Sequence, residues 1–380
     1  MLEFTPEYEH FATIKVIGIG GGGGNAVNRM IDAKIRGVEF IVANTDAQVL
    51  RQTKALQKVQ IGSQLTKGLG AGGRPDVGRL AAEEDRDSLY RALEGSDMIF
   101  LTAGMGGGTG TGAAPIIADL AGEIGALAVA VVTRPFHFEG PRRLKVAEAG
   151  LAELADKVDT LIIVPNEKLL KIVARETTIT ESFRLADEVL VQAVRGISDL
   201  ITVPGLINVD FADVRAVMSE AGGSAIMGTG VGAGEGRAAL AAQNVISSPL
   251  LDGINIKGAR GILINVTGGS DMTLHEINEA VDIVNEVADE DANVIVGAVV
   301  EEGLEEFRIT VIATGFEAPA MREAGIFDEA GVAASMVHAA PLPPAPPKGM
   351  PIDFDDALLG SEFDIPAFIR QRSRTGEMEN

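Results

Sequence analysis

The sequence contains no cysteine, is short of basic residues relative to acidic ones, and holds no long hydrophobic run. Without cysteine, disulfides, thiolate metal sites and cysteine nucleophiles are excluded. A formal net charge of −22 argues against a nucleic-acid-binding protein, because such proteins need clustered Lys and Arg to contact the phosphate backbone. No apolar run reaches about 18 residues, and the first residues carry no signal-peptide pattern. We therefore expect a soluble, cytoplasmic protein without a transmembrane segment.

Two patterns that often identify an enzyme are also absent. The 4 histidines are scattered and show no metal-ligand spacing. The motif G-x-x-x-x-G-K-[ST] does not occur, which disfavours a P-loop nucleotide hydrolase. A bound triphosphate would therefore be held chiefly by backbone N–H groups and a metal ion.

Two glycine-rich loops are present where such backbone sites form. The first, Gly18-Ile-Gly-Gly-Gly-Gly23, matches G-x-G-x-x-G and follows an apolar stretch at 14–20. The second, Gly106-Gly-Gly-Thr-Gly-Thr-Gly112, follows the apolar run 98–101. We expect a helix to begin within or just after these glycines, with Pro115 in its first turn. Glycine lets the backbone approach a ligand closely, and the free N–H groups of a helix start favour an anion. Both loops are therefore candidate phosphate sites.

The order of strand, polar or glycine-rich turn and helix recurs along the first half of the chain. We expect strands at 14–20, 38–43, 98–102, 127–133 and 160–164, helices at 25–34 and 79–93, and a loop at 67–78. In a doubly wound parallel sheet the carboxyl ends of the strands lie on one edge, where ligands bind. The predicted fold class is therefore α/β and Rossmann-like, with both glycine loops facing one site.

A long amphipathic helix and a second, smaller α/β domain follow. Thr178 and Glu181 form a capping-box pattern before a helix predicted at 180–201. Further strands are expected at 261–266, 294–300 and 307–313, with a helix at 274–288.

The composition changes after residue 316. The proline-rich and acidic stretch there cannot bury enough apolar surface to fold, and residues 363–372 combine apolar and basic side chains as a groove-binding peptide does. The predicted organisation is a flexible N-terminus (1–12), a nucleotide-binding α/β domain (13–179), a central helix (180–203), a C-terminal α/β domain (204–316), a disordered linker (317–362) and a partner-binding peptide (363–380).

The first glycine motif alone also fits an NAD-dependent oxidoreductase, because G-x-G-x-x-G is the dinucleotide-binding pattern. A dinucleotide fold holds its pyrophosphate with one such turn, whereas two facing loops suit a longer and more highly charged phosphate chain. We therefore favour a nucleoside triphosphate and keep the oxidoreductase as the alternative.

Taken together, the motifs resemble those of the tubulin/FtsZ family. Residues 106–112 match the loop shared by tubulin and FtsZ, and Gly20-Gly-Gly-Gly-Gly-Asn-Ala26 is similar to the first loop of FtsZ. Asn208-Val-Asp-Phe-Ala-Asp213 matches the N-x-D-x-x-D segment of FtsZ, and Asp364-Ile-Pro-Ala-Phe368 is similar to its terminal peptide. These motifs occur in the family's order over the whole chain.

The resemblance implies a GTPase that polymerises head to tail into filaments and forms the bacterial division ring. It implies GTP or GDP as ligand, with Mg²⁺ held through phosphates and water. A filament protein that binds GTP but hydrolyses it poorly is a further alternative, against which the retained Asn208, Asp210 and Asp213 argue.

The resemblance also assigns nucleotide contacts. Ala71-Gly-Gly73 corresponds to a loop near the γ-phosphate, although Gly73 followed by Arg74 departs from the Ala-Asn pair common in relatives. Asp187 takes the base-reading position, where a carboxylate accepts from N1–H and the 2-amino group of guanine; adenine presents neither, which favours GTP over ATP. Phe183 is available to stack on the base. The implied nucleotide-binding residues are Gly21, Gly22, Gly23, Gly24, Asn25, Ala71, Gly72, Gly73, Gly106, Gly107, Gly108, Thr109, Gly110, Thr133, Glu139, Arg143, Asn166, Phe183 and Asp187.

Asn208, Asp210 and Asp213 are the predicted catalytic residues. By resemblance they lie at the opposite pole of the protomer and orient water for attack on the γ-phosphate of the next subunit's nucleotide. The alternative is that Asp210 and Asp213 only cap the following helix.

The resemblance also implies partners and a location. The partners are further copies of this chain, together with membrane-tethering and regulatory division proteins; nucleic acid is not among them. Its location is the cytoplasm at the division site under the inner membrane. The residues that would contact the division proteins are Asp364, Ile365, Pro366 and Phe368.

Overall fold

The computed structural model describes residues 12–174, 176–203, 205–219, 223–251 and 258–316 of the 380-residue chain. The predicted linker at 317–362 and the partner-binding peptide at 363–380 lie outside the described residues, as does nearly all of the predicted flexible N-terminus. Those three assignments therefore stay predictions.

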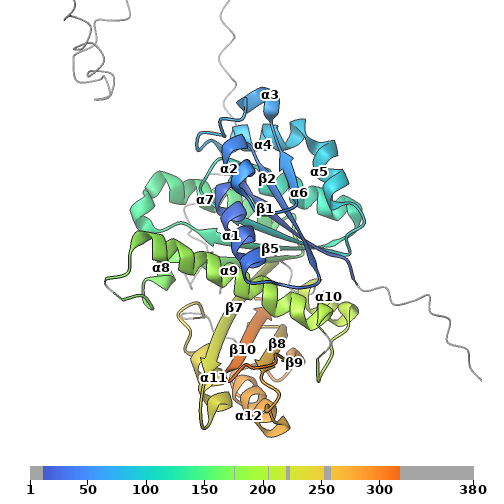
Figure 1. The fold of residues 1–380 in the computed structure, drawn as a ribbon, viewed down its shortest axis with the longest axis vertical. Coiled ribbons are helices and arrows are strands. Elements are labelled where there is room, and N and C mark those ends of the chain that lie inside the picture. The colour runs from blue at the N-terminus through green and yellow to red at the C-terminus, as the bar shows by residue number, and fades with distance from the viewer. Residues whose placement is uncertain (1–11, 175, 204, 220–222, 252–257, 317–380) are drawn as a thin grey trace, which may run out of the picture. The chain divides into compact units, whose positions relative to one another are not determined.

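A ten-stranded sheet runs through the described part of the chain in the order β3-β2-β1-β4-β5-β6-β7-β10-β8-β9 (Figure 1). Its first seven strands are mutually parallel, which confirms the doubly wound sheet. The central strand β5 is buried along almost its whole length, as expected of a parallel strand covered on both faces. These seven strands are β1 (Ile14–Ile19), β2 (Val38–Asn44), β3 (Gln57–Gln60), β4 (Met98–Gly104), β5 (Leu127–Arg134), β6 (Thr160–Pro165) and β7 (Gly223–Gly232).

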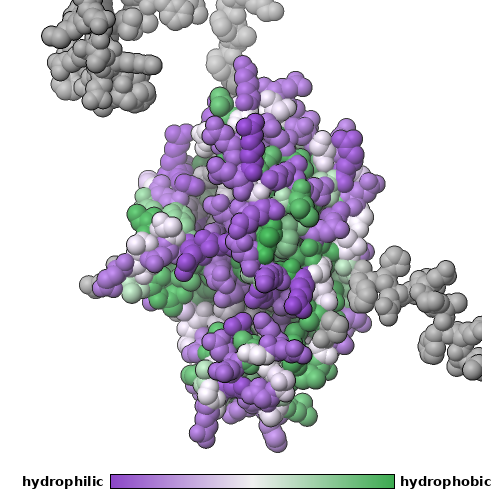
Figure 2. All heavy atoms as spheres, in the orientation of Figure 1, coloured by the Kyte–Doolittle hydropathy of each residue, from purple (hydrophilic) through white to green (hydrophobic). Residues whose placement is uncertain are grey.

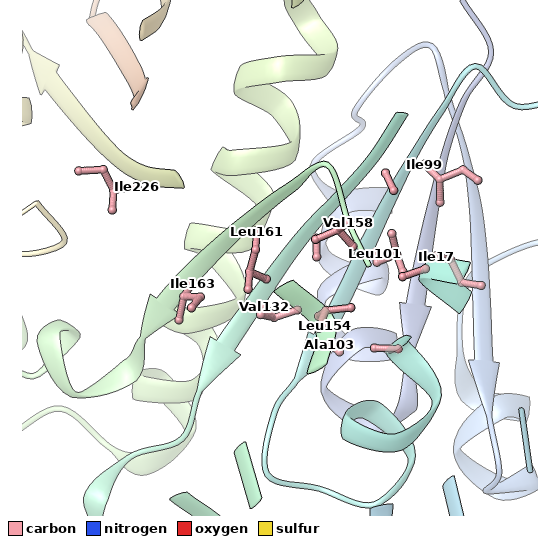
Figure 3. Packing of buried hydrophobic residues seen from close by; sticks show 14 of the residues in the cluster. Ile17, Ile99, Leu101, Ala103, Val132, Leu154, Val158, Leu161, Ile163 and Ile226 are labelled. Atoms are coloured by element: carbon pink, nitrogen blue, oxygen red, sulfur yellow. The ribbon is translucent and has the colours of Figure 1, made fainter. Parts of the chain in front are cut away.

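Helices cover both faces of the parallel part. One face packs against α4 (Pro75–Glu84), α5 (Arg86–Leu93), α6 (Thr109–Ile124) and α7 (Pro141–Ala155). Figure 3 shows this side of the core, where Leu101 and Val132 of neighbouring strands lie near Leu154 of α7. The other face packs against α1 (Gly20–Asp32), α2 (Ala47–Gln52), α8 (Asn166–Leu169) and α9 (Ile179–Thr202). Polar residues cover most of the face seen in Figure 2, with apolar residues in patches between them.

Several predicted boundaries in this half are wrong. Helix α1 begins at Gly20 rather than Asn25, so the first glycine loop forms the opening turns of the helix itself. Helix α6 begins at Thr109, within the second glycine loop as expected, but Pro115 lies in its interior instead of its first turn. The expected helix at 79–93 is two helices, α4 and α5, that meet at Asp85, and α4 starts within the expected loop. The short elements α2, β3, α3 (Ser63–Thr66) and α8 were not expected.

The central helix α9 is confirmed. The Thr178 hydroxyl accepts the Glu181 N–H at 3.2 Å, while the Glu181 carboxylate accepts the Thr178 N–H at 2.9 Å. The apolar stripe of α9 packs on the sheet, with Val189, Val194 and Ile197 buried.

The second half contains the predicted strands β8 (Gly261–Gly268), β9 (Asn293–Val300) and β10 (Phe307–Thr314) and helix α12 (Leu274–Asn285). Strand β7 and helix α11 (Arg237–Ile246) were not predicted, because β7 is glycine-rich and looks like a loop. Its glycines make room for α11: an ideal Cβ on Gly230 would lie 2.1 Å from the carbonyl oxygen of Ala241. Helix α10 (Phe211–Ser219) lies between α9 and β7 in sequence.

Candidate functional site

The two glycine loops meet at the carboxyl end of β1 and β4. An ideal Cβ on Gly20 would lie 3.0 Å from the backbone nitrogen of Gly110, and one on Gly22 would lie 3.2 Å from that of Gly104. The backbones of the two loops are therefore too close for side chains between them. The structure brings both loops to one place, as the sequence pattern predicted.

The glycines of the predicted site fall into two groups. Gly21, Gly72 and Gly73 face open space, and an ideal Cβ on Gly107 has no neighbour closer than 4.0 Å. The others are packed against neighbouring protein atoms. An ideal Cβ on Gly23 would lie 2.2 Å from the carbonyl oxygen of Thr102, and one on Gly110 would lie 2.9 Å from that of Gly104. An ideal Cβ on Gly108 would lie 2.8 Å from Cβ of Ala71, and one on Gly24 would lie 3.5 Å from the side chain of Val42. Open backbone for a ligand is thus offered by the first group, and the second group sets the spacing of the loops.

The segment 71–74 lies directly against the second loop. Ala71 is buried there, and Gly72 and Gly73 have φ of +60° and +71°, in the left-handed region that favours glycine. Glycine at 73 is therefore unstrained in this conformation. Arg74 is exposed and pairs with Asp76 at 2.6 Å, which lowers the pKa of that carboxyl.

A pocket of about 140 Å³ opens beside the loops, at the carboxyl ends of the parallel strands. The sequence analysis missed five of its lining residues, which are small or apolar and carry no chemical signal of their own: Gly104, Met105, Pro135, Ala186 and Leu190. The predicted residues that line it are Gly22, Asn25, Thr133, Glu139, Arg143, Asn166, Phe183 and Asp187.

Two polar groups of the pocket differ in their hydrogen bonding. The Glu139 carboxylate accepts the Phe136 N–H at 2.9 Å and pairs with Arg143 at 3.1 Å, so it is held in place before any ligand binds. Asn166 is only 3% exposed, and its side-chain carbonyl oxygen has no hydrogen-bond partner among the described residues. A buried acceptor without a partner is costly, so an N–H donor on a ligand would be favoured at this position.

An aromatic cluster borders the pocket. The ring of Phe136 lies 5.0 Å from that of Phe138, in a stacked arrangement, and 5.4 Å edge-on from that of Phe183. Phe136 is buried, whereas Phe183 is 40% exposed and Phe138 is 61% exposed. The exposed rings offer apolar faces to a planar ligand.

Asp187 on α9 is engaged by a residue that the sequence analysis missed. Nε of Arg29, on α1, donates to its carboxylate at 2.9 Å. Burial raises the pKa of Asp187, while the hydrogen bond and charge of Arg29 act in the opposite direction. A carboxylate that is partly buried beside a cation can still accept from a second donor, such as the N–H edge of a base.

The carboxyl end of β2 supplies further polar groups that were not assigned to the site. Thr45 and Thr109 share a buried hydrogen bond of 2.7 Å between their hydroxyls, which ties β2 to the second loop. Asn44 is buried, and its side-chain nitrogen has no partner among the described residues. The available signal was position, since these residues follow a strand as the glycine loops do.

Asn208, Asp210 and Asp213 lie far from this pocket. Helix α10, which carries Asp213, is bonded to the amino ends of two strands: Arg215 donates to Gly125 O at 3.0 Å, and Thr160 donates to Met218 O at 2.5 Å. The pocket lies at the carboxyl ends, so the length of β5, about 25 Å, separates the two regions. Figure 1 shows α10 at the end of α9 remote from α8.

The three residues are exposed, and two have backbone partners. Asp210 accepts the Asp213 N–H at 2.8 Å and so caps α10, as the alternative interpretation expected. Asn208 accepts the Gly205 N–H at 2.7 Å. In that cap Asp213 contributes its backbone N–H, not its carboxylate.

The described residues contain neither a cluster of metal-ligating side chains nor a membrane-spanning helix. Among the described residues, no group of three or more His, Asp or Glu side chains is placed to hold a metal ion. Within the same part of the chain, no helix is both long and apolar enough to span a membrane.

Comparisons with known proteins agree with this geometry. Residues 13–174 match the GTPase domain of the Tubulin/FtsZ family, and residues 223–317 match the FtsZ family C-terminal domain. An empty FtsZ dimer from M. jannaschii has 48% sequence identity and a TM-score of 0.77, covering 80% of this chain and 88% of that one. A mutant FtsZ from the same organism has 47% identity and the same TM-score, covering 80% and 91%.

More distant structures share the fold. GDP-bound monomeric CetZ1 from Haloferax volcanii has 20% identity and a TM-score of 0.71, covering 85% of this chain and 99% of that chain. The matched GTPase domain, together with the fold, thus defines a tubulin-like GTPase class. Within that class, the chain belongs to the FtsZ family.

Proposed function

We propose that this chain hydrolyses GTP as a subunit of a head-to-tail homopolymer, with each active site completed between two adjacent subunits. The observation that carries the proposal is the separation of Asp210 and Asp213 from the nucleotide pocket. Groups at opposite edges of one sheet cannot act on the same phosphate within one protomer. In a head-to-tail contact, the α10 edge of one subunit meets the pocket edge of the next.

Binding of GTP is supported by the chemistry of the pocket. Gly21, Gly72, Gly73 and Gly107 offer open backbone to phosphates. Glu139 and Arg143 are held at the pocket wall for the ribose and phosphates, and Asn25, Asn166 and Asp187 offer polar groups to the base. Guanine presents two adjacent donors to the Asp187 carboxylate, which favours GTP over ATP.

Mg²⁺ fits this site as a nucleotide-borne ion. Because the described residues offer no carboxylate cage, the metal would be held mainly by phosphates and water, as is usual for this ion. Its chemistry would be to neutralise phosphate charge. The residues of the chain then have to position the nucleotide and the attacking water.

We further propose that the filaments form the division ring in the cytoplasm, under the membrane. An FtsZ relative of 48% identity is described as a dimer, which supports self-association of this chain. Residues 363–380, and within them Asp364, Ile365, Pro366 and Phe368, would bind the proteins that tether and regulate the ring.

The proposal predicts that GTP turnover per molecule rises with protein concentration, and that Asp213→Ala lowers this turnover by about a hundredfold or more while assembly with GTP persists. Asp213 is the better target than Asp210, because replacing Asp210 also removes the helix cap. Phosphate release and light scattering, measured on the same samples across a concentration series, check both parts. Glu279→Ala, an exposed acid on α12, serves as the control and should behave like wild type.

Three results would contradict the proposal in different ways. If the turnover per wild-type molecule does not change with protein concentration, the active site is not shared between subunits. If Asp213→Ala hydrolyses GTP at the wild-type rate, Asp213 is not a catalytic residue. Slow hydrolysis by the assembled wild type would favour the alternative of a filament protein that binds GTP but scarcely hydrolyses it.

A further inference from the structure

A buried ion pair lies one layer behind the nucleotide pocket. Nε of Arg134 is 2.5 Å from Oε1 of Glu148, and the two side chains are 15% and 9% exposed. Arg134 ends β5 directly after Thr133, and Glu148 lies on α7, which also carries Arg143. The pair therefore joins the two elements that supply one wall of the pocket.

Helix α7 also touches the second glycine loop directly. An ideal Cβ on Gly106 would lie 2.7 Å from both Cγ and the carbonyl oxygen of Arg143, so the first turn of α7 rests against the loop backbone. Gly106 has φ of +94°, a conformation that other residues rarely adopt. A shift of α7 at this contact must move either the loop or Arg143.

A second contact reaches the same loop from further along the helix. An ideal Cβ on Gly150 would lie 2.2 Å from Cγ2 of Thr111, so α7 and α6 are in close contact there. The hydroxyl of Thr111 accepts the N–H of Gly106 at 2.9 Å. The position of Gly106 therefore depends on α7 in two ways: directly through Arg143, and through Thr111 of α6, which contacts Gly150.

Apolar packing alone would attach α7 to the sheet. Leu151 and Leu154 are fully buried against it, yet such contacts are non-directional. A buried ion pair gains little stability over apolar residues of similar volume, because removing both charges from water is costly. What it adds is a contact between opposite charges that fixes the distance between β5 and α7.

We propose that the Arg134–Glu148 pair is a positioning element for nucleotide binding: it holds α7 in the register that places Arg143, Glu139 and the Gly106 loop around the phosphates and ribose. The inference rests on the nucleotide contacts of the proposed function and deepens them. Neither residue touches the nucleotide; both act through α7.

The test compares nucleotide affinity with fold stability in three variants. Glu148→Gln breaks the pair, whereas the double variant Arg134→Met/Glu148→Leu replaces it by apolar contact that restores stability. Glu153→Gln is the matched control, because Glu153 also lies on α7 and also pairs with an arginine, Arg79, away from the pocket. Titration with fluorescent GDP at concentrations too low for assembly gives Kd, and thermal unfolding without nucleotide gives Tm.

Glu148→Gln is expected to raise the Kd for GDP about tenfold, the usual effect of losing a residue that orients a ligand-binding group. The double variant is expected to recover Tm but keep the weakened binding, and KM should rise more than kcat falls. Glu153→Gln should leave Kd within about twofold, since its partly exposed pair with Arg79 does not join α7 to β5.

Two results would overturn the inference: an unchanged Kd in Glu148→Gln, or a Kd that recovers together with Tm in the double variant. The second would make the pair a stability element alone. If the wild-type protein itself fails to bind GDP, the proposed function fails first, and the two failures are therefore distinguishable.

Discussion

At the scale of single residues, the described part of the chain keeps several polar groups at positions where burial disfavours them. Asn166 and Asn44 each hold an unpaired polar atom beside the glycine loops. Asp187 is largely buried next to Arg29, and Asp199, further along α9, is buried among charges of both signs. Asn166 and Asp187 line the pocket, where the proposed nucleotide would supply further hydrogen-bond partners.

Asp199 gives a prediction about pH. Burial raises the pKa of Asp199 to about 6; Glu301 acts in the same direction, while Arg195 and Arg36 oppose it. The pKa in the folded protein thus lies above the ordinary Asp value near 3.9. The folded state holds this proton more tightly, so the contribution of Asp199 to stability falls as pH rises from about 4 to 6.

The neutral variant Asp199→Asn is therefore expected to be more stable than wild type at pH 7.5, by at most about 3 kcal/mol, with the difference shrinking below pH 6. Urea unfolding of both proteins at pH 5, 6 and 7.5 measures it. Asp291→Asn, at an exposed acid, is the control for the substitution itself. A pH-independent difference for Asp199→Asn would show that its carboxyl titrates as an ordinary exposed acid.

At the scale of elements, close contacts between helices position the second glycine loop and the segment 71–74. Helices α4 and α6 approach so closely that an ideal Cβ on Gly112 would lie 2.0 Å from the carbonyl oxygen of Pro75. An ideal Cβ on Gly78 of α4 would likewise lie 2.2 Å from the carbonyl oxygen of Gly108. The segment 71–74 leads into α4 and the second loop leads into α6, so this helix contact sets the distance between the two.

Gly112→Ala is accordingly expected to destabilise the fold by about 3 kcal/mol, because the added methyl has no space, and to weaken nucleotide binding by displacing the loop. Gly122→Ala on the same helix is the matched control: an ideal Cβ there meets nothing within 4 Å, and alanine should stabilise α6 by about 0.5–1 kcal/mol. Urea unfolding with and without GDP measures both effects. A Gly112→Ala protein as stable as wild type would contradict the contact.

At the scale of the whole molecule, the proposed active site is divided between two edges of one sheet. The pocket lies at the carboxyl ends of the parallel strands and α10 at their amino ends, joined by the length of α9, about 36 Å. Under the proposed function, a repeated head-to-tail contact would unite the two edges without any change within the protomer. Hydrolysis would then be a property of the polymer.

This division predicts complementation between inactive variants. Asp187→Ala impairs the pocket edge and Asp213→Ala the α10 edge, so each alone should hydrolyse GTP slowly. Mixed together they should recover part of the activity, because the intact pocket of one variant meets the intact α10 edge of the other. Phosphate release at constant total protein measures the recovery.

A mixture of Asp210→Ala with Asp213→Ala is the control for this experiment. Both variants carry their defect on the same edge, so every contact in the mixture lacks one carboxylate and no recovery is expected. Equal activity in the two mixtures would mean that the pocket and α10 do not act across subunits.

Much of the fold could be predicted because its signals are local. An apolar run followed by glycines indicates a buried strand before a backbone-lined turn, and Thr178 with Glu181 marks the start of α9 within a few residues. The same signals misplaced the starts of α1 and α4 and the place of Pro115 in α6, because glycine and proline mark breaks in a pattern without showing on which side of the break the helix begins. In α1 the glycines are already helical.

What the sequence by itself determined is the position of most strands, the sheet edge on which the glycine loops lie, and the family of the chain. Only the tertiary structure decided which glycines face open space, that Arg29 engages Asp187 from a helix 158 residues away in sequence, and that Arg134 and Glu148 join β5 to α7. Only the tertiary structure also showed that the glycine-rich segment β7 is a strand, because α11 occupies the space that side chains on its glycines would need. The reason is physical: strand and turn preferences act between neighbouring residues, whereas pairing and close packing depend on partners that a local pattern does not specify.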